Sequence, residues 1–505
     1  MKNILEMVEY SALNYPEKLA FRDSESDMTY LQLVAKAKKI GTEIAKSGIY
    51  GRPVAIIVDR SVKCLTAMLS VLYSGNFYTV IDTEMPDDRV ESIFKTLKPA
   101  AVICTANLIQ KANKCYRGRV FVYEECLNTK TDNMLLCGIR ARSVASDPAY
   151  VLFTSGSTGV PKGAVLSHAS VIAYIKWFAS AFNITADTVF GSQTPFYFSM
   201  SVSDVYATLF TGATLNIIPK QLFSFPMKLL EMLNERKVNT IYWVPSALCI
   251  IANWRVLDYG KAEYINKVLF AGEVMPTKQL NYWISKLPDA MFANLFGPTE
   301  TTDICTYYTV DRHFEDSEPL PIGRHCDNCD VFIVSDSGKP AADGEEGELY
   351  VRGPFLAHGY YNNREKTEEA FVQNPLNGSY PETVYKTGDL VRYNEKGELI
   401  YICRKDFQIK HMGYRIELGE VEAAANGLDF VTACVSLYDA ESDSIILIYQ
   451  GKKQEIPYIR ELLAKRLPNY MMPQKIFVIK SMTYNQNGKI DRAFLKNNYK
   501  TITGE

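Results

Sequence analysis

The sequence predicts an α/β fold in which a large N-terminal domain, residues 1–403, is followed by a small α+β C-terminal domain, residues 404–505. Three observations predict this organisation. Short apolar β-type runs alternate with helical patterns in the first part, short strands separated by turns follow, and the pattern changes again near Arg404. At 505 residues the chain exceeds one ordinary core, and a prior of roughly 150 residues per domain predicts about three packed units.

The first element expected is a surface helix, because residues 1–23 place acidic residues among apolar ones at helical spacing. The same residues contain neither a long apolar run nor a small-residue cleavage site. The alternation that follows predicts two α/β subdomains with largely parallel sheets. The β-type runs are VAIIV (54–58), AAVIC (100–104), VFVY (120–123) and YVLFT (150–154), and SVKCLTAMLSVLYSG (61–75) is an example of the helical pattern.

A β-rich subdomain is expected over about residues 320–403, because from Val331 onward short strands are separated by hairpin-type turns such as SDSGK and NEKG. After Arg404 strands and helices alternate within about a hundred residues, with one helix expected near 459–466. This last part therefore reads as a separate α+β domain.

Composition excludes several classes of partner. Hydrophobic residues make up 47% of the chain, charged residues 22%, and the net charge of −2 leaves no positive excess to hold nucleic acid or acidic lipids. The chargeless stretch 188–203 contains Pro195 and several hydroxyl residues, so it lacks the near-continuous apolarity of a spanning helix and membrane insertion is not expected. A cytoplasmic protein is predicted, and the eleven scattered cysteines agree with a reducing compartment.

Only Cys326 and Cys329 form a CxxC pair. The neighbouring His325 does not complete a zinc site, which would need a second pair of ligands. We therefore expect these thiols to have a structural role.

The strongest local signal is a strand that runs into a loop of glycine, serine and threonine, VLFTSGSTGVPKG at 151–163. Glycines allow close approach of the backbone to a ligand, hydroxyls and amides donate hydrogen bonds, and one lysine adds charge, so the loop suits a polyphosphate. It is not a Walker A loop, because Lys162 is followed by Gly163. Composition alone would also fit a flexible surface turn. The residues expected to contact a nucleotide here are Thr154, Ser155, Gly156, Ser157, Thr158, Gly159 and Lys162.

This loop resembles the signature loop of the adenylate-forming (ANL) superfamily, which includes acyl-CoA synthetases, luciferases and the adenylation domains of peptide synthetases. The resemblance extends along the whole chain and in the order of that family's motifs. The further matching segments are YSGNFYTVIDTEMPDDR (73–89), NLFGPTE (294–300), GELYVRGPFLAHGYYN (347–362), YKTGD (385–389), RKDFQIKHMGYRIELGEVE (404–422) and NQNGKIDR (485–492).

The resemblance implies ATP and Mg²⁺ as cofactors, AMP as a product, and a catalytic set of Lys489, Glu300 and Thr154. Lys489 would stabilise the charge that develops on the α-phosphate while pyrophosphate leaves. Glu300 would supply a hard oxygen ligand for the metal. Asp389 would accept hydrogen bonds from the ribose hydroxyls beside its cationic neighbour Arg404. The other nucleotide contacts implied are Gly272, Glu273, Asn294, Phe296, Gly297 and Thr299, with Phe296 stacked on adenine and Asn294 at its amino edge.

By the same resemblance the C-terminal domain is a mobile lid. Asp406 matches the hinge about which this domain rotates, and Gly413 would then line the passage of a pantetheine arm. Taken alone, Gly413 would fit an ordinary bend in a strand.

The substrate pocket implied by the motif positions is lined by Ser199, Met200, Ser203, Tyr242, Leu269, Ala271, Leu295, Asp303 and Ile304. Amino-acid-activating members carry at the position of Ser199 an aspartate that binds the substrate's α-ammonium, and the D-alanine ligases carry a cysteine where this chain has Ala271. A standard α-amino acid is therefore not expected. Asp303 either recognises an amine farther from the carboxylate, or a hydroxyl of an aryl acid, or merely supports its loop.

The sequence of the 410–422 segment most resembles that of peptide-synthetase adenylation domains and of D-alanine:carrier-protein ligases. The implied function is adenylation of a carboxylic acid and transfer of the acyl group to the phosphopantetheine thiol of a carrier protein. The alternative is an acyl-CoA or aryl-CoA synthetase that uses free CoA. A non-catalytic relative and a P-loop phosphotransferase are the other classes, and the missing GK[ST] argues against the latter.

Overall fold

The structure is a computed structural model that describes residues 1–155, 160–316, 318–405, 408–483 and 490–504. It contains two compact units, of which the first comprises residues 1–83, 97–152 and 163–405. The second comprises residues 84–96, 153–162 and 406–505. The domain boundary predicted at residue 404 stays a prediction, because the second unit also includes two segments from earlier in the chain.

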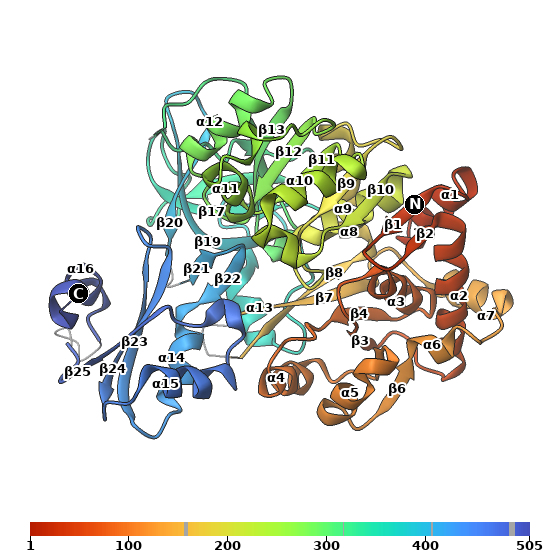
Figure 1. Ribbon diagram of the computed structural model, residues 1–505, viewed down its shortest axis with the longest axis horizontal. Coiled ribbons are helices and arrows are strands. Elements are labelled where there is room, and N and C mark those ends of the chain that lie inside the picture. The colour runs from red at the N-terminus through yellow and green to blue at the C-terminus, as the bar shows by residue number, and fades with distance from the viewer. Residues whose placement is uncertain (156–159, 317, 406–407, 484–489, 505) are drawn as a thin grey trace. The chain divides into compact units, whose positions relative to one another are not determined.

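A six-stranded sheet forms the N-terminal part of the fold, with strand order β6-β5-β3-β4-β7-β8 (Figure 1). From β6 to β7 every pair is parallel, as the continuous apolar runs predict. The strands are β3 (Pro53–Ile57), β4 (Phe77–Val80), β5 (Ala101–Cys104), β6 (Arg119–Val122), β7 (Pro148–Thr154) and β8 (Lys162–Ser167). The helices of this region are α1 (Leu5–Asn14), α2 (Tyr30–Lys46), α3 (Val62–Tyr73), α5 (Ile109–Cys115), α6 (Tyr123–Cys126) and α7 (Asn133–Arg142).

Helix α1 confirms the predicted N-terminal helix and packs against both α2 and α9 (Met200–Thr211). Helix α2 begins at a capping box, in which the Thr29 hydroxyl accepts from the Gln32 N–H and the Gln32 side chain accepts from the Thr29 N–H. Helix α1 therefore lies between α2 of the N-terminal region and α9, a helix of the region that follows.

A nine-stranded sheet follows, with strand order β15-β14-β13-β12-β11-β9-β10-β1-β2. Its central strands are parallel, and antiparallel pairs close both ends. The strands are β1 (Leu19–Arg22), β2 (Asp27–Thr29), β9 (Val189–Ser192), β10 (Thr214–Ile217), β11 (Thr240–Trp243), β12 (Lys267–Ala271), β13 (Met291–Phe296), β14 (Thr306–Thr309) and β15 (Arg324–His325). The helices here, besides α9, are α8 (His168–Ala181), α10 (Pro226–Glu235), α11 (Pro245–Asn253) and α12 (Thr277–Lys286).

The predicted β-rich subdomain is an antiparallel sheet with strand order β16-β17-β19-β18, in which β20 pairs with β19. The expected turns at SDSGK and NEKG each contain a glycine with positive φ, Gly338 and Gly397. The elements are β16 (Asp330–Val334), β17 (Gly347–Arg352), α13 (Arg364–Ala370), β18 (Phe371–Gln373), β19 (Thr383–Tyr393) and β20 (Leu399–Arg404).

The second unit has a three-stranded sheet, β23-β24-β25, a two-stranded hairpin and helices. Its core is formed by apolar residues such as Val421, Ile445 and Leu463, all fully buried. The elements are most of α4 (Asp87–Leu97), then β21 (Gln408–His411), β22 (Tyr414–Glu417), α14 (Leu418–Asn426), β23 (Val431–Asp439), β24 (Ser444–Gly451), α15 (Ile456–Ala464), β25 (Lys475–Ile479) and α16 (Arg492–Thr503).

The structure confirms the predicted fold class: two α/β regions, a β-rich region and a small α+β part. Among the described residues, no helix combines the length and the apolarity that crossing a membrane requires.

Candidate functional site

The carboxyl ends of four parallel strands, β9, β11, β12 and β13, lie side by side in the nine-stranded sheet. In open α/β sheets this edge is where ligands bind. The register pairs Tyr242 with Leu269 and Ala271 with Leu295, so the sheet places these four predicted pocket residues on adjacent strands near that edge. All four are buried.

Asp303 lies in a cluster of hydroxyl groups at this edge. Its Oδ2 accepts hydrogen bonds from Ser203 Oγ at 2.5 Å, from Tyr174 OH at 3.1 Å and from Tyr242 OH at 3.1 Å. The residue is 1% exposed. Burial raises the pKa of Asp303 to about 6, and the hydroxyl donors oppose that rise because they favour the ionised form. At pH 7 the ionised form of the carboxyl group therefore predominates.

Tyr174 is the member of this cluster that the sequence did not predict. It lies on α8, where its ring packs edge-on against Phe355 at 5.4 Å. No motif surrounds it, and its helical apolar context is typical of a core residue. Its hydrogen bonds with Ser203 Oγ, 2.7 Å long, and to Asp303 Oδ2, 3.1 Å long, assign it to the pocket.

Ser199, which replaces the expected aspartate, precedes α9 as its N-cap but makes no capping hydrogen bond there. Its hydroxyl instead accepts from Thr299 Oγ1 at 3.4 Å and lies close enough to Asp303 to favour the ionised carboxylate. Met200, which follows Ser199 in the chain, and Ile304, which follows Asp303, are also buried. All nine predicted pocket residues thus lie in the first unit, and Ser199, Ser203, Tyr242 and Asp303 are brought together.

Glu300 is fully buried in the short helix Thr299–Thr301 that follows β13. Its Oε1 accepts a hydrogen bond of 2.6 Å from Tyr360 OH. The next residue but one, Thr302, has a φ of +70°, which is a strained conformation for a non-glycine residue and is typical of functional loops. Burial and the hydrogen bond from Tyr360 together fix the position of the Glu300 carboxylate.

The donor set around Glu300 fits Mg²⁺. This ion is usually bound through one or two carboxylates together with substrate phosphates and water, so a single buried carboxylate suffices. A dedicated protein cage is not required, and within the described ranges no group of three or more His, Cys, Asp or Glu side chains is placed to hold a metal.

Two nucleotide residues predicted at the end of β13 are also buried. Asn294 donates from Nδ2 to the carbonyl of Pro321 at 2.8 Å, and the Phe296 ring lies 5.8 Å from that of Tyr401. Gly297 allows the loop to fold back on itself, because a Cβ there would lie 2.3 Å from the carbonyl oxygen of Asp303. Adenine stacking on Phe296 stays a prediction.

Asp389 and Arg404 are neighbours on the antiparallel strands β19 and β20. Arg404 Nη1 lies 3.1 Å from Asp389 Oδ1, and both side chains are buried. The Asp389 N–H also donates to Thr387 Oγ1 at 3.0 Å. The structure therefore places the predicted carboxylate and its cationic neighbour in direct contact.

Gly272 and Glu273 follow β12. Gly272 has a φ of +94°, a conformation that favours glycine, and it turns the chain away from the strand. Glu273 Oε2 accepts a hydrogen bond of 2.9 Å from the Ser246 N–H, at the start of α11. Glu273 thus has a structural contact whether or not it contacts a nucleotide.

Thr154, Ser155 and Lys162 of the predicted phosphate-binding loop lie in the second unit. Ser155 Oγ donates to the carbonyl of Arg415 at 2.8 Å and accepts from the Glu417 N–H at 3.1 Å. Lys162 Nζ lies 3.6 Å from Glu417 Oε1, and Thr154 Oγ1 donates to the Lys162 carbonyl at 3.4 Å. Both ends of the loop are therefore held by polar contacts.

Gly413 lies in a two-residue turn between β21 and β22. Met412 and Gly413 have φ values of +51° and +80°, as the turn types favoured in tight hairpins require. Gly413 is therefore a turn residue, and its predicted role beside a pantetheine arm stays a prediction. Several other predicted residues lie outside the described residues, namely Gly156, Ser157, Thr158, Gly159, Asp406 and Lys489.

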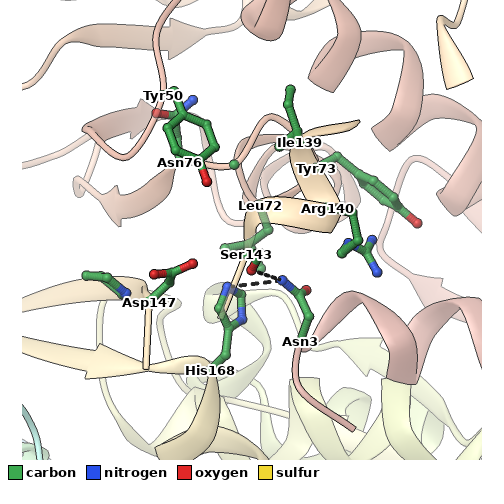
Figure 2. A pocket seen from close by; sticks show the side chains of 12 residues that line it. Asn3, Tyr50, Leu72, Tyr73, Asn76, Ile139, Arg140, Ser143, Asp147 and His168 are labelled. Atoms are coloured by element: carbon green, nitrogen blue, oxygen red, sulfur yellow. Dashed lines mark hydrogen bonds between the residues drawn. The ribbon is translucent and has the colours of Figure 1, made fainter. Parts of the chain in front are cut away.

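A separate small cavity of about 20 Å³ lies among α1, α3, α7 and the start of α8 (Figure 2). His168 lines it and is buried, with Nδ1 accepting from the Ile4 N–H at 3.3 Å. Asn3 Nδ2 donates to Ser143 Oγ at 3.0 Å in the same cavity. The space suffices for one water molecule. His168 therefore has a packing role at the start of α8.

Burial lowers the pKa of His168 to about 4, whereas an unfolded histidine titrates near 6.5. Between these values the unfolded chain binds a proton that the native chain excludes, so His168 destabilises the fold as the pH drops from about 6.5 toward 4. Replacing it by His168→Asn is expected to reduce the loss of unfolding free energy between pH 7 and pH 5 by about 2 kcal/mol in urea titrations. The exposed His313, replaced by asparagine, is the control and should leave this pH dependence unchanged; an equal effect of both variants would contradict the assignment.

The model of the AMP-binding enzyme family matches residues 8–361 of the chain. Tyrocidine synthase 3 from Brevibacillus parabrevis is 32% identical over 97% of this chain, which spans 8% of that protein. D-alanine–D-alanyl carrier protein ligase from Lacticaseibacillus casei is 29% identical, with 98% of both chains covered. The o-succinylbenzoate CoA synthetase from Bacillus subtilis, solved as a double mutant with a product analogue, has the same fold, with a TM-score of 0.84 at 19% identity over 98% of each chain.

Proposed function

Because the chain belongs to the family of AMP-binding, adenylate-forming enzymes, we propose that it activates a carboxylic acid with ATP and then transfers the acyl group to the phosphopantetheine thiol of a carrier protein. Its homologues include peptide-synthetase adenylation domains and D-alanine:carrier-protein ligases. In the first step a carboxylate oxygen attacks the α-phosphorus and pyrophosphate leaves. In the second step the thiol sulfur attacks the acyl carbonyl, the proton leaves the thiol, and AMP departs.

One observation carries this proposal: a single tight loop after β13 bears both Glu300, buried against Tyr360, and Asp303, buried in the pocket. The loop is fixed by Gly297 and by the strained Thr302. Only two residues separate the candidate metal carboxylate from the candidate substrate carboxylate. This arrangement suits a reaction that joins a substrate acid to a metal-bound phosphate, because both reactants are positioned by one rigid element.

Different residues of the chain would have different roles in the first step. Glu300 would hold Mg²⁺, which when bound supplies charge stabilisation to the phosphates of ATP. Asp389, fixed by Arg404, would bind the ribose hydroxyls, and Phe296 would contact the adenine. Lys162 and Lys489 would supply positive charge, Lys162 toward the outer phosphates and Lys489 toward the α-phosphate as pyrophosphate leaves.

The thiol acceptor distinguishes the proposal from its alternative, a CoA synthetase. The ligase relative that matches this chain over nearly its full length acts, by its name, on a carrier protein, and this supports a carrier acceptor here. Structural likeness to a CoA synthetase shows only the shared fold.

The acceptor can be tested by offering both thiols to the same acyl-adenylate. The enzyme is incubated with ATP, its best acid, and either CoA or a panel of phosphopantetheinylated carrier proteins, and the thioester is detected by mass. We expect carrier loading with at least one carrier and CoA acylation at least about tenfold slower. Faster acylation of CoA than of every carrier would replace the proposal by its alternative, and the unmodified apo carriers serve as the control.

A further inference from the structure

We propose that Asp303 is the receptor for a substrate ammonium group that lies beyond the α-carbon, so that the activated acid is an aliphatic β- or γ-amino acid. This inference rests on the proposed function, because it names the substrate class of the same site. It depends on the burial of Asp303, on the hydroxyl groups that surround its carboxylate, and on the negative charge that these hydroxyl groups do not neutralise.

The charge of Asp303 is not neutralised by the protein. Within the described part of the chain, it forms no ion pair with a Lys, Arg or His side chain within 4.0 Å. The main groups that favour its ionised form are the hydroxyls of Ser203, Tyr242 and Tyr174. Hydroxyl donors solvate an anion but leave its net charge in place, and a buried uncompensated charge is costly.

The hydrogen bonds also hold the Asp303 carboxylate in a fixed orientation. The hydroxyls of Ser203, Tyr174 and Tyr242 all donate to Oδ2. Three donors on one oxygen fix the plane of the carboxylate, and the Ser199 hydroxyl is a further group that favours its ionised form. A site whose polar groups are held in this way is preorganised for binding.

The position of Ser199 indicates how far the ammonium must lie from the substrate carboxyl group. The aspartate expected at this position would have bound an α-ammonium, but the Ser199 hydroxyl is uncharged. It lies against Asp303 and receives a hydrogen bond from Thr299 in the loop that carries Glu300. The negative charge is therefore displaced by about one hydrogen-bond length, roughly 3 Å, from the usual place. One or two additional methylene groups span that distance.

The remaining walls favour an aliphatic spacer. The other predicted pocket residues are apolar and buried: Met200, Leu269, Ala271, Leu295 and Ile304. Such walls accommodate methylene groups between carboxyl and ammonium and offer no partner to a polar spacer. An aryl acid with a hydroxyl group would leave the charge of Asp303 without a counter-ion.

The test uses ATP–pyrophosphate exchange with matched acids. The wild-type enzyme is assayed with β-alanine and 4-aminobutyrate, with propionate and butyrate as the same acids without the amine, and with glycine, D-alanine, hydroxybenzoates and longer fatty acids. We expect the β- or γ-amino acid to have a kcat/KM at least about tenfold above that of its amine-free counterpart and of glycine. Best turnover with D-alanine, with a hydroxybenzoate or with an amine-free acid would overturn the inference. No exchange with any acid would instead overturn the proposed function.

The variant Asp303→Asn keeps the shape of the side chain and removes its charge. It is expected to lower kcat/KM for the amino acid about 10²-fold and to leave the amine-free acid within about threefold, because a charge-assisted bond is lost for only one of them. Ser203→Ala retains the charge and should keep the preference for the amine with a smaller loss. Thermal unfolding and ATP binding report whether each variant is folded. An equal loss for both acids in a folded Asp303→Asn protein would assign Asp303 a loop-supporting role and contradict the proposal.

Discussion

Replacing Lys489 with alanine is expected to slow acyl-adenylate formation about 10²- to 10³-fold, the largest effect we predict for a single side chain. Charge develops on the α-phosphate while the carboxylate attacks, and an ammonium placed there stabilises the transition state more than the ground state. Lys489 lies outside the described residues, so the expectation rests on its place in the motif NQNGKIDR. Single-turnover measurement of pyrophosphate release isolates this step.

Two readouts separate this role from a general loss of the C-terminal domain. Transfer of the acyl group from chemically prepared acyl-adenylate to the carrier should stay within about threefold of the wild type, since Lys489 acts before that step. The exposed Lys496 on α16, replaced by alanine, is the matched control and should leave both steps unchanged. Unchanged adenylation in Lys489→Ala would remove the proposed role of this lysine.

Glu300→Gln is expected to lower the rate of adenylation about 10²-fold, because charge stabilisation by a held Mg²⁺ is worth several kcal/mol and about 1.4 kcal/mol corresponds to a factor of ten. Glutamine has the same shape and still offers an oxygen to Tyr360 OH, so the fold around the loop should persist. The distinguishing readout is the Mg²⁺ dependence: the concentration that gives half-maximal rate should rise in the variant.

Tyr360→Phe is the companion to this variant. It removes the hydrogen bond of 2.6 Å that orients the carboxylate but keeps the charge. We expect a loss of about tenfold to a hundredfold, typical of groups that orient a metal ligand. A Glu300→Gln enzyme with the wild-type Mg²⁺ dependence would show that the metal is held elsewhere.

Individual strands were predictable from the sequence where burial alone decides the pattern, whereas the order of the strands in the sheets was not predicted. The run 54–58 corresponds to β3 (Pro53–Ile57), all of whose residues are buried, because apolar residues buried on both faces of a strand give a continuous apolar signal. The helix expected near 459–466 begins earlier, at Ile456. A proline at the second position of the helix favours its start there, whereas the periodic spacing of apolar residues does not locate that start.

The site was predictable only in part. The order of the family's motifs identified Asp389 and Arg404 as candidate site residues. Their contact follows from the hairpin at NEKG, which pairs β19 with β20. Tyr174 was missed because a tyrosine in an apolar helix has the same sequence context whether its hydroxyl faces a pocket or the core. Its role depends on α8 packing against α9, a tertiary contact that no local pattern encodes.

The account predicts, above all, that an oxygen of the substrate carboxyl group becomes bonded to the α-phosphorus of ATP. The measurement is to label both carboxyl oxygens of the substrate acid with heavy oxygen, allow one complete turnover to the carrier thioester, and analyse the phosphate products by mass. We predict AMP that carries one labelled oxygen and pyrophosphate that carries none. Label in inorganic phosphate together with ADP, or AMP without label, would contradict it.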